Sequence, residues 1–348
     1  MKVLLLLALA SFGCASRSEE QPAADAAATD APAVCNVAES FPTITGDDPY
    51  AYPPYALDEC SLVYVATDGS LHLADLGGSH DEVLDVGPAR RPTLAGETVA
   101  WEATEGGASV VRVRHGADPL VTFKGGEPRA ARDGVVFTRW ISADANGDTD
   151  VLLYVPSTKQ TITVAAGPGQ QRFADVSDEL VALTDFSEDP DGRFDGNATD
   201  LADIAIFDRA TSVLTVRKRA GKQGFPLLPG GKALVYHDWA SIHPQPKLEA
   251  YELWRGTVDA AVSADSRLVA VETQPPYVRP AGRGGVIEWV ARDATGIALF
   301  RAPVFGTPVR VSGLDAWDLF APATAGARTA IGVRTGTSAS ATLRILAR

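Results

Sequence analysis

Short apolar runs recur through this 348-residue sequence in groups of four, separated by turns rich in Gly, Pro, Asp and Ser. The runs are rich in Val, Leu, Thr, Tyr and Trp, which is typical of short antiparallel strands rather than helices. Clear groups lie at 53–86, 91–123, 128–164 and 172–216, and looser ones at 225–254, 260–300 and 317–346. The pattern predicts an all-β chain of seven four-stranded units, with six as the alternative count.

Units of about 35 to 53 residues are too small for each four-stranded sheet to bury both of its faces alone. Packed radially around an axis, such sheets cover one another and leave only short edges, which is the architecture of a β-propeller. The last unit lacks an outermost strand, and residues 41–45 (FPTIT) can supply it. We therefore expect a β-propeller over residues 35–348, its ring closed by an N-terminal strand.

Two segments carry the pattern of a known blade type. Residues 262–270 (VSADSRLVA) place an Asp turn between apolar runs, and residues 71–78 (LHLADLGG) form an apolar run that ends in Asp-x-x-Gly. They resemble the blades of TolB-type propellers, and the generic resemblance extends over residues 50–348. It implies a periplasmic scaffold that binds other envelope proteins without catalysis. The separate N-terminal α/β domain of TolB has no counterpart here, so only the architecture is implied, not an orthologous role.

The N-terminus has the organisation of a bacterial signal peptide over residues 1–14. Lys2 precedes an apolar run at 3–10, which is shorter than the roughly 20 residues that span a bilayer, so removal is expected. Residues 11–14 (SFGC) resemble a lipobox and make Cys14 the lipidation site. Ordinary cleavage after Ala15 is the alternative, and would give a secreted or soluble periplasmic protein.

Residues 15–34 are rich in Ala, Pro and acidic residues and contain almost no large apolar side chain. Such a segment cannot bury enough surface to fold, so it predicts a disordered tether between anchor and propeller. Ala15 and Ser16 after Cys14 resemble lipoproteins sorted to the outer membrane. The expected location is therefore a lipid anchor in the outer membrane, facing the periplasm or the cell surface.

Once Cys14 is assigned to lipid, Cys35 and Cys60 remain. They allow one disulfide in an oxidising compartment, which would lock the closure of the ring, and two free thiols are the alternative. The net charge of −13 argues against nucleic acid and against direct docking on anionic membranes. We expect a monomer that meets the membrane only through lipid and binds an envelope protein or a glycan.

Two acidic loops are the candidate metal sites. Their oxygen-bearing residues alternate as in Ca²⁺ loops, although the downstream Glu of an EF-hand is missing. The alternative is turn chemistry without metal, because Asp, Asn and Gly favour turns through local hydrogen bonds. The candidate ligands are Asp144, Asn146, Asp148 and Asp150 in the first loop and Asp189, Asp191 and Asp195 in the second.

No catalytic residue is assigned, because nucleophile-elbow, zinc-protease and phosphate-loop motifs are all missing from the sequence. His237 and His243 flank Trp239 but lack a third ligand. The tryptophans in predicted strands predict packing between units, with ligand stacking around a channel as the alternative; they are Trp101, Trp140, Trp239, Trp254, Trp289 and Trp317.

Three functions follow from these features. The favoured one is a non-enzymatic envelope lipoprotein whose propeller binds a protein or glycan. The second is a propeller hydrolase or lyase that uses carboxylates such as Asp144, Asp148 or Asp191 at the channel mouth. The third is a structural propeller stabilised by Ca²⁺.

Overall fold

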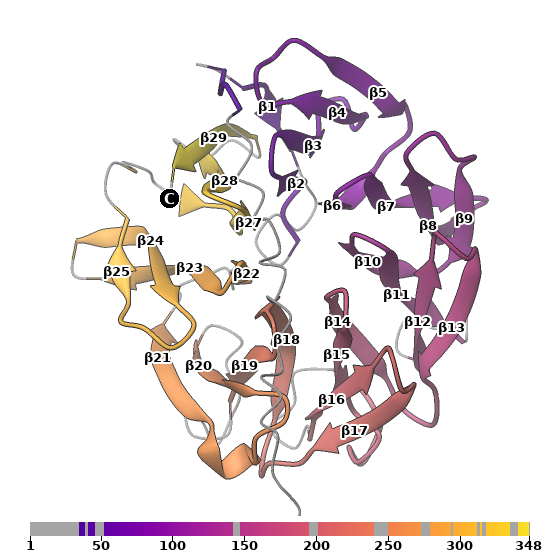
Figure 1. The fold of residues 1–348 in the computed structure, drawn as a ribbon, viewed down its shortest axis with the longest axis vertical. Helices are drawn as coiled ribbons and strands as arrows, with labels where there is room; N and C mark the ends of the chain where they lie inside the picture. The colour runs from indigo at the N-terminus through magenta and orange to yellow at the C-terminus, as the bar shows by residue number, and fades with distance from the viewer. Residues whose placement is uncertain are drawn as a thin grey trace, which may run out of the picture. The chain divides into compact units, whose positions relative to one another are not determined.

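The computed structural model describes residues 35–38, 41–45, 52–141, 147–194, 201–239, 250–272, 279–293, 295–311, 314, 318–334 and 340–347. They belong to the unit Pro32–Arg348 and form seven antiparallel sheets, which Figure 1 shows arranged radially around one axis. This part of the chain is a seven-bladed all-β propeller, as the repeats predict. The expected signal peptide, Cys14 and the tether lie outside the described residues.

Each of the first six blades has four consecutive strands, ordered from the axis outward. The strands of the first three blades are β2 (Tyr55–Asp58), β3 (Ser61–Val65), β4 (Leu71–Asp75), β5 (Asp81–Asp85), β6 (Arg90–Ala95), β7 (Thr98–Glu105), β8 (Ala108–His115), β9 (Val121–Lys124), β10 (Gly126–Ala131), β11 (Gly134–Trp140), β12 (Thr149–Val155) and β13 (Gln160–Ala165).

The next three blades follow the same plan. Their strands are β14 (Gln171–Val176), β15 (Leu180–Asp185), β16 (Asp203–Asp208), β17 (Val213–Arg217), β18 (Gln223–Gly230), β19 (Ala233–Asp238), β20 (Ala250–Thr257), β21 (Ser266–Glu272), β22 (Ala281–Arg283), β23 (Val286–Asp293), β24 (Gly296–Pro303) and β25 (Val309–Arg310).

The seventh blade contains strands from both ends of the chain. Its interrupted inner strand consists of β26 (Asp318–Leu319) and β27 (Ala323–Ala325), which both pair with β28 (Arg328–Arg334). Next comes β29 (Ala341–Ala347), and outermost is β1 (Thr43–Ile44), with Ile44 opposite Ala341. The expected closure of the ring by an N-terminal strand is confirmed.

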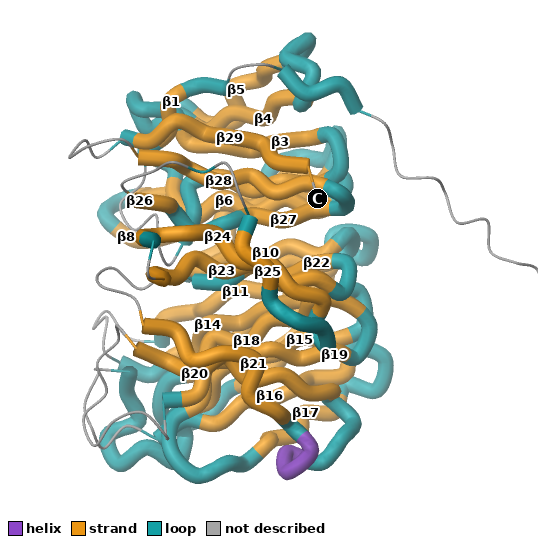
Figure 2. The backbone as a smooth tube through the Cα atoms, turned by 90° about the vertical axis from the view of Figure 1, so that its left-hand side faces the viewer, coloured by secondary structure: helices purple, strands orange, loops and turns teal. Residues whose placement is uncertain are grey.

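The apolar pattern of each strand follows from its distance to the axis. Second strands such as β15 and β19 are almost wholly buried, because a neighbouring blade covers each of their faces. Outer strands such as β17 are largely exposed. Figure 2 shows from the side how the strands cross the propeller between two loop-bearing faces. Trp101 and Trp289, each 1% exposed, lie in apolar clusters together with residues of a neighbouring blade, which confirms the packing role predicted for them.

The position at which the sixth unit was predicted to begin is wrong. Residues 262–270 do not begin that blade: Val262–Ala264 is a short 3-10 turn, and β21 is the outermost strand of the fifth blade, with Val269 opposite Leu253. The buried Asp265 in this segment accepts hydrogen bonds from Arg217 and Tyr236. The true inner strand, β22, is only three residues long and contains Gly282, so its apolar signal is weak.

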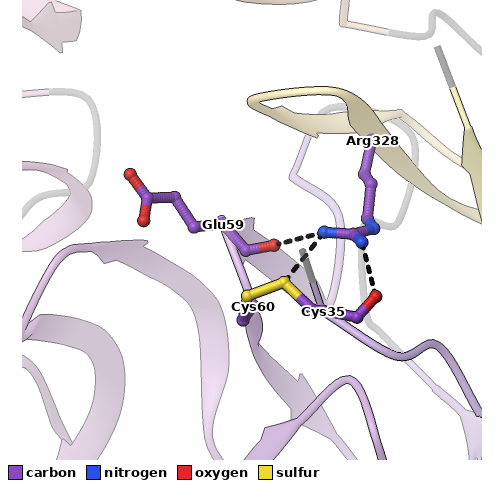
Figure 3. Close-up of a disulfide and its surroundings, with 4 residues drawn as sticks. All are labelled: Cys35, Glu59, Cys60 and Arg328. Atoms are coloured by element: carbon purple, nitrogen blue, oxygen red, sulfur yellow. Dashed lines mark hydrogen bonds between the residues drawn. A yellow bond between two sulfur atoms is a disulfide. The ribbon is translucent and has the colours of Figure 1, made fainter. Parts of the chain in front are cut away.

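A disulfide fastens the closure of the ring, as Figure 3 shows. Cys35 and Cys60 are bonded, with their Cα atoms 5.5 Å apart, which joins the segment before β1 to the β2–β3 turn. Arg328 of the seventh blade donates to the carbonyl oxygens of Cys35 at 2.8 Å and Glu59 at 3.3 Å. The bridge and the guanidinium thus connect the first and last blades at one point.

Replacing both Cys35 and Cys60 with Ser should lower the free energy of unfolding by about 3 kcal/mol, because the bridge restricts a loop of 25 residues in the unfolded chain. Chemical denaturation of the exported protein measures the change. A Cys14→Ser protein keeps the bridge and is the matched control, and wild type in excess reductant should behave like the double variant. Equal stability of double variant and control would contradict this account.

Candidate binding site on the propeller axis

A cavity of about 370 Å³ lies on the propeller axis. The innermost strand of every blade lines it, together with several of the turns that follow these strands. Its walls are mainly proline and small or aliphatic side chains, such as Pro92, Ala130, Leu228 and Pro322. A concave, mostly apolar cavity with a few polar groups is the usual form of a ligand site.

Four consecutive inner strands enter this region through the same irregularity, a bulge near the start of β6, β10, β14 and β18. Here Arg91, Glu127, Phe173 and Phe225 have left-handed backbones, with φ of 51, 57, 54 and 49°. This conformation costs an L-residue about 1–2 kcal/mol, and three of the four also precede proline. Because the strain recurs at one place, the packing around the axis must stabilise it.

These residues and two from other blades form a set that we call the axial layer: Tyr52, Arg91, Glu127, Phe173, Phe225 and Arg279. The ring of Tyr52 lies against guanidinium carbons of Arg91, Arg129 and Arg279, at 4.3, 5.3 and 5.8 Å from its centroid. These arginines come from the second, third and sixth blades. Tyr52 therefore lies close to the axis, where separate blades meet.

Glu127 is the carboxylate of the axial layer. It accepts a hydrogen bond from Arg172 at 2.6 Å and one from Thr138 at 3.0 Å, and it is 3% exposed. Burial alone would raise the pKa of Glu127, but the charge and hydrogen bond of Arg172, with Arg91 nearby, lower that pKa to about 2. Glu127 is thus an anion whose charge Arg172 neutralises.

Arg129 and Arg279 line the cavity without such a partner. In the part of the chain that the structure describes, Nε and Nη2 of Arg279 are buried without a hydrogen bond, and the side chain is 2% exposed overall. Arg129 likewise makes no hydrogen bond or ion pair to a described residue. Burial and the charge of Arg279 lower the pKa of Arg129 to about 10, which reflects two guanidinium groups held near each other. The Tyr52 hydroxyl beside them is also buried without a partner among these residues.

His237 packs beneath this cluster rather than forming a metal site. Its ring lies 5.4 Å from those of Phe225 and Trp239, and the side chain is fully buried. Burial and the nearby Arg279 lower the pKa of His237 well below its ordinary value, so the ring is neutral. His243 and Trp317 lie outside the described residues, and no described tryptophan lines the axial cavity.

The described parts of the two acidic loops meet at Gln170, which bonds to the Gly147 and Gly192 carbonyls. Asp148 accepts the Gly169 N–H at 3.1 Å, and Asp150 pairs with Arg139.

In the second loop, Asp189 accepts backbone N–H groups at its own turn and from Leu201. Asp191 accepts the N–H of Arg193. Within the described ranges there is no group of three or more potential metal ligands, and Asp144, Asn146 and Asp195 lie outside them. The calcium site stays a prediction. Neither Asp148 nor Asp191 lines the axial cavity.

One cluster on the first blade has the hydrogen-bond order of a hydrolytic triad. Ser70 Oγ lies 2.9 Å from His72 Nε2, and His72 Nδ1 lies 2.9 Å from Asp81. The Ser70 hydroxyl, however, donates to Asp68 at 2.5 Å, and Tyr64 donates to Asp81 at 2.8 Å. None of these residues lines the axial cavity. Because the nucleophile would need to give its proton to histidine, this cluster is a structural network.

No family model and no curated protein matches this sequence. Among solved structures, the chain is similar to oligogalacturonate lyase from Vibrio parahaemolyticus, with a TM-score of 0.55 and 11% identity over 87% of this chain and 90% of that one. It is also similar to the β-propeller domain of the Trilobed protease from Pyrococcus furiosus, which has an open velcro topology, with a TM-score of 0.54 and 10% identity over 74% and 82%.

TolB from Acinetobacter baumannii matches with a TM-score of 0.46 and 15% identity, over 74% of this chain and 63% of TolB. The seven sheets confirm the propeller architecture that the blade pattern implied. At these identities the likeness concerns the fold alone, and it assigns no activity to the axial cavity.

Glu127→Gln should remove part of the acid sensitivity of the fold. The folded pKa is below the usual value, so the stabilisation from Glu127 is present above about pH 4.5 and is lost as pH falls toward 2. The shift corresponds to at most about 3 kcal/mol, measured as the free energy of unfolding against pH. The matched control is Glu82→Gln, which breaks a half-exposed pair with Arg114 and should change stability by less than about 1 kcal/mol. A wild-type acid profile in Glu127→Gln would refute the assignment.

Proposed function

We propose that this protein is a non-enzymatic lipoprotein of the bacterial outer membrane whose propeller binds an envelope protein or glycan in its axial cavity. The observation that carries the proposal is the cavity itself, which the inner strands of all seven blades line and in which Arg129 and Arg279 have no hydrogen-bonded carboxylate among the described residues. Such a site is preorganised to hold a ligand, since its shape is set by the packing of the blades.

The chemistry of the cavity favours binding over catalysis. General acid–base catalysis needs a positioned group that exchanges protons near neutral pH. An arginine guanidinium does not do so, and Asp175, which also lines the cavity, accepts the Leu228 N–H at 2.8 Å. The carboxylates Asp148 and Asp191, considered for a hydrolase or lyase, lie elsewhere.

The N-terminal sequence supports the proposed location. No helix in the described ranges has the length and apolar character needed to cross a membrane. Residues 11–14 resemble a lipobox, and residues 15–34 resemble a tether that would hold the propeller away from the bilayer. Lipid on Cys14 would therefore supply the attachment to the membrane.

Crosslinking in intact cells, followed by recovery of the tagged full chain, tests both parts of the proposal. Wild type should fractionate with the outer membrane and carry a crosslinked partner, whereas Cys14→Ser should be released into the soluble fraction because the anchor is lost. Ala281→Trp, which fills the cavity, should lose the partner but keep its location. Ala210→Trp, on an exposed turn, is the matched control. Unchanged fractionation of Cys14→Ser would refute the anchor. Failure to recover a crosslinked partner with either wild type or Cys14→Ser would refute the binding role.

A further inference from the structure

We infer that the axial cavity binds the C-terminal carboxylate of a protein segment with apolar side chains, which Arg129 and Arg279 hold between them. This inference rests on the proposed function and names the chemistry of its ligand.

Three other arginines that are buried or half-buried in this propeller have carboxylate partners. Arg217 forms a two-bond pair with Asp265 at 3.0 and 2.9 Å, and Arg301 bonds to Glu288 at 2.6 Å. Arg172 is paired with Glu127 in the axial layer. The chain has ample carboxylates for this purpose, with 44 acidic against 31 basic residues. Against that surplus, the unpaired state of Arg279 points to a counter-ion that comes from outside the chain.

The buried groups without a partner next to Arg129 can all donate hydrogen bonds. Nε and Nη2 of Arg279 and the Tyr52 hydroxyl are buried and unpartnered among the described residues. Arg129 lines the same cavity, and its guanidinium lies 5.3 Å from the Tyr52 ring centroid. A buried guanidinium without an acceptor is costly, and a carboxylate satisfies two N–H groups of one arginine at once. One carboxylate between the two arginines would also relieve their mutual repulsion.

The side chains of the cavity walls determine which kind of group can carry the carboxylate. Aliphatic and proline side chains surround the approach to the arginines, including Leu57, Leu94, Val176, Leu227 and Pro280.

The aromatic ring that lines the described cavity belongs to Tyr55, whose hydroxyl is already bonded to Ala321 and Gly332. A sugar acid would need aromatic rings on which to stack, and Tyr55 is the one that the described walls supply. An apolar peptide terminus needs only the arginines and the aliphatic surface.

Fluorescence polarisation with the purified full chain tests the inference. The probe is an N-terminally labelled hexapeptide of Ala, Val and Leu with a free C-terminal carboxylate. Converting that carboxylate to an amide should weaken binding about 10- to 100-fold, because charged hydrogen bonds are lost. Arg279→Gln and Arg129→Gln should weaken binding of the free acid to a similar extent and leave the amide unaffected. Arg114→Gln removes a half-exposed arginine that pairs with Glu82 and does not line the cavity, and is the matched control with a change below about 3-fold.

Thermal melting gives a second readout that does not require a ligand. Arg279→Met removes a buried charge that has no carboxylate partner among the described residues, so its melting temperature should equal or exceed that of wild type. The free-acid peptide should raise the melting temperature of wild type but not that of Arg279→Met. A strongly destabilised Arg279→Met protein would show that Arg279 is satisfied within the fold, and would overturn the inference.

Further probes separate the possible sources of the carboxylate. Hexanoate binding as tightly as the peptide would show that a free aliphatic acid suffices and would overturn the protein terminus as occupant. Tighter binding of trigalacturonate would replace it by a sugar acid. If the peptide does not bind while crosslinking in cells still recovers a partner that Ala281→Trp loses, the carboxylate inference fails and the proposed function stands. Peptide binding without any partner in cells would refute the proposed function instead.

Discussion

A blade of this propeller is not stable alone, because its second strand is apolar on both faces and needs a neighbour on each side. The first and seventh blades obtain that neighbour only if the two ends of the described chain meet. Pairing of β1 with β29 brings them together, and the Tyr55 hydroxyl joins them near the axis by donating to Ala321 at 2.6 Å and accepting from Gly332 at 2.7 Å. The Cys35–Cys60 bridge then fastens the segment before β1 to the first blade. Every interface between blades depends on this closure, since an open ring would expose two apolar faces.

Radial closure also creates the electrostatic character of the axis. Seven inner strands converge there, and residues at one position of the repeat, just before the proline in most blades, come into contact across the ring. In the axial layer, Glu127 is the single carboxylate among the described residues, and Arg172 already occupies it. Arg129, from the same strand as Glu127, and Arg279, from the sixth blade, also reach this place, and neither forms an ion pair with a described residue. The excess of positive charge thus results from geometry, because each blade contributes its side chain independently of the others.

Local patterns were sufficient to predict the architecture and insufficient to predict the site. Strand alternation, turn residues and the period of the repeat are encoded in adjacent residues, so the seven blades, the closing strand and the Cys35–Cys60 pair could all be predicted. The start of the sixth blade was predicted too early in the sequence. Its inner strand β22 is short and contains glycine, whereas the apolar run of β21 just before it resembles an inner strand. Tyr52, Arg129 and Arg279 were missed because they lie on three blades far apart in the sequence. A signal was present, however: a bulky or charged residue stands directly before proline at Tyr52, Arg91, Glu127, Phe225 and Arg279.

The contrast between the outside and the axis of this molecule restricts what can enter the cavity. The net charge of −13 repels anions at long range, yet salt screens that field over about 8 Å under physiological conditions. The guanidinium groups act at contact distance in a region from which solvent is largely excluded, where each ionic hydrogen bond is stronger than at the surface. A small, highly charged anion would gain from the arginines but would be repelled on approach and would leave the aliphatic walls unfilled. A ligand that carries one negative charge at the end of an apolar segment is repelled least and buries the most apolar surface, so the two features select the same kind of molecule.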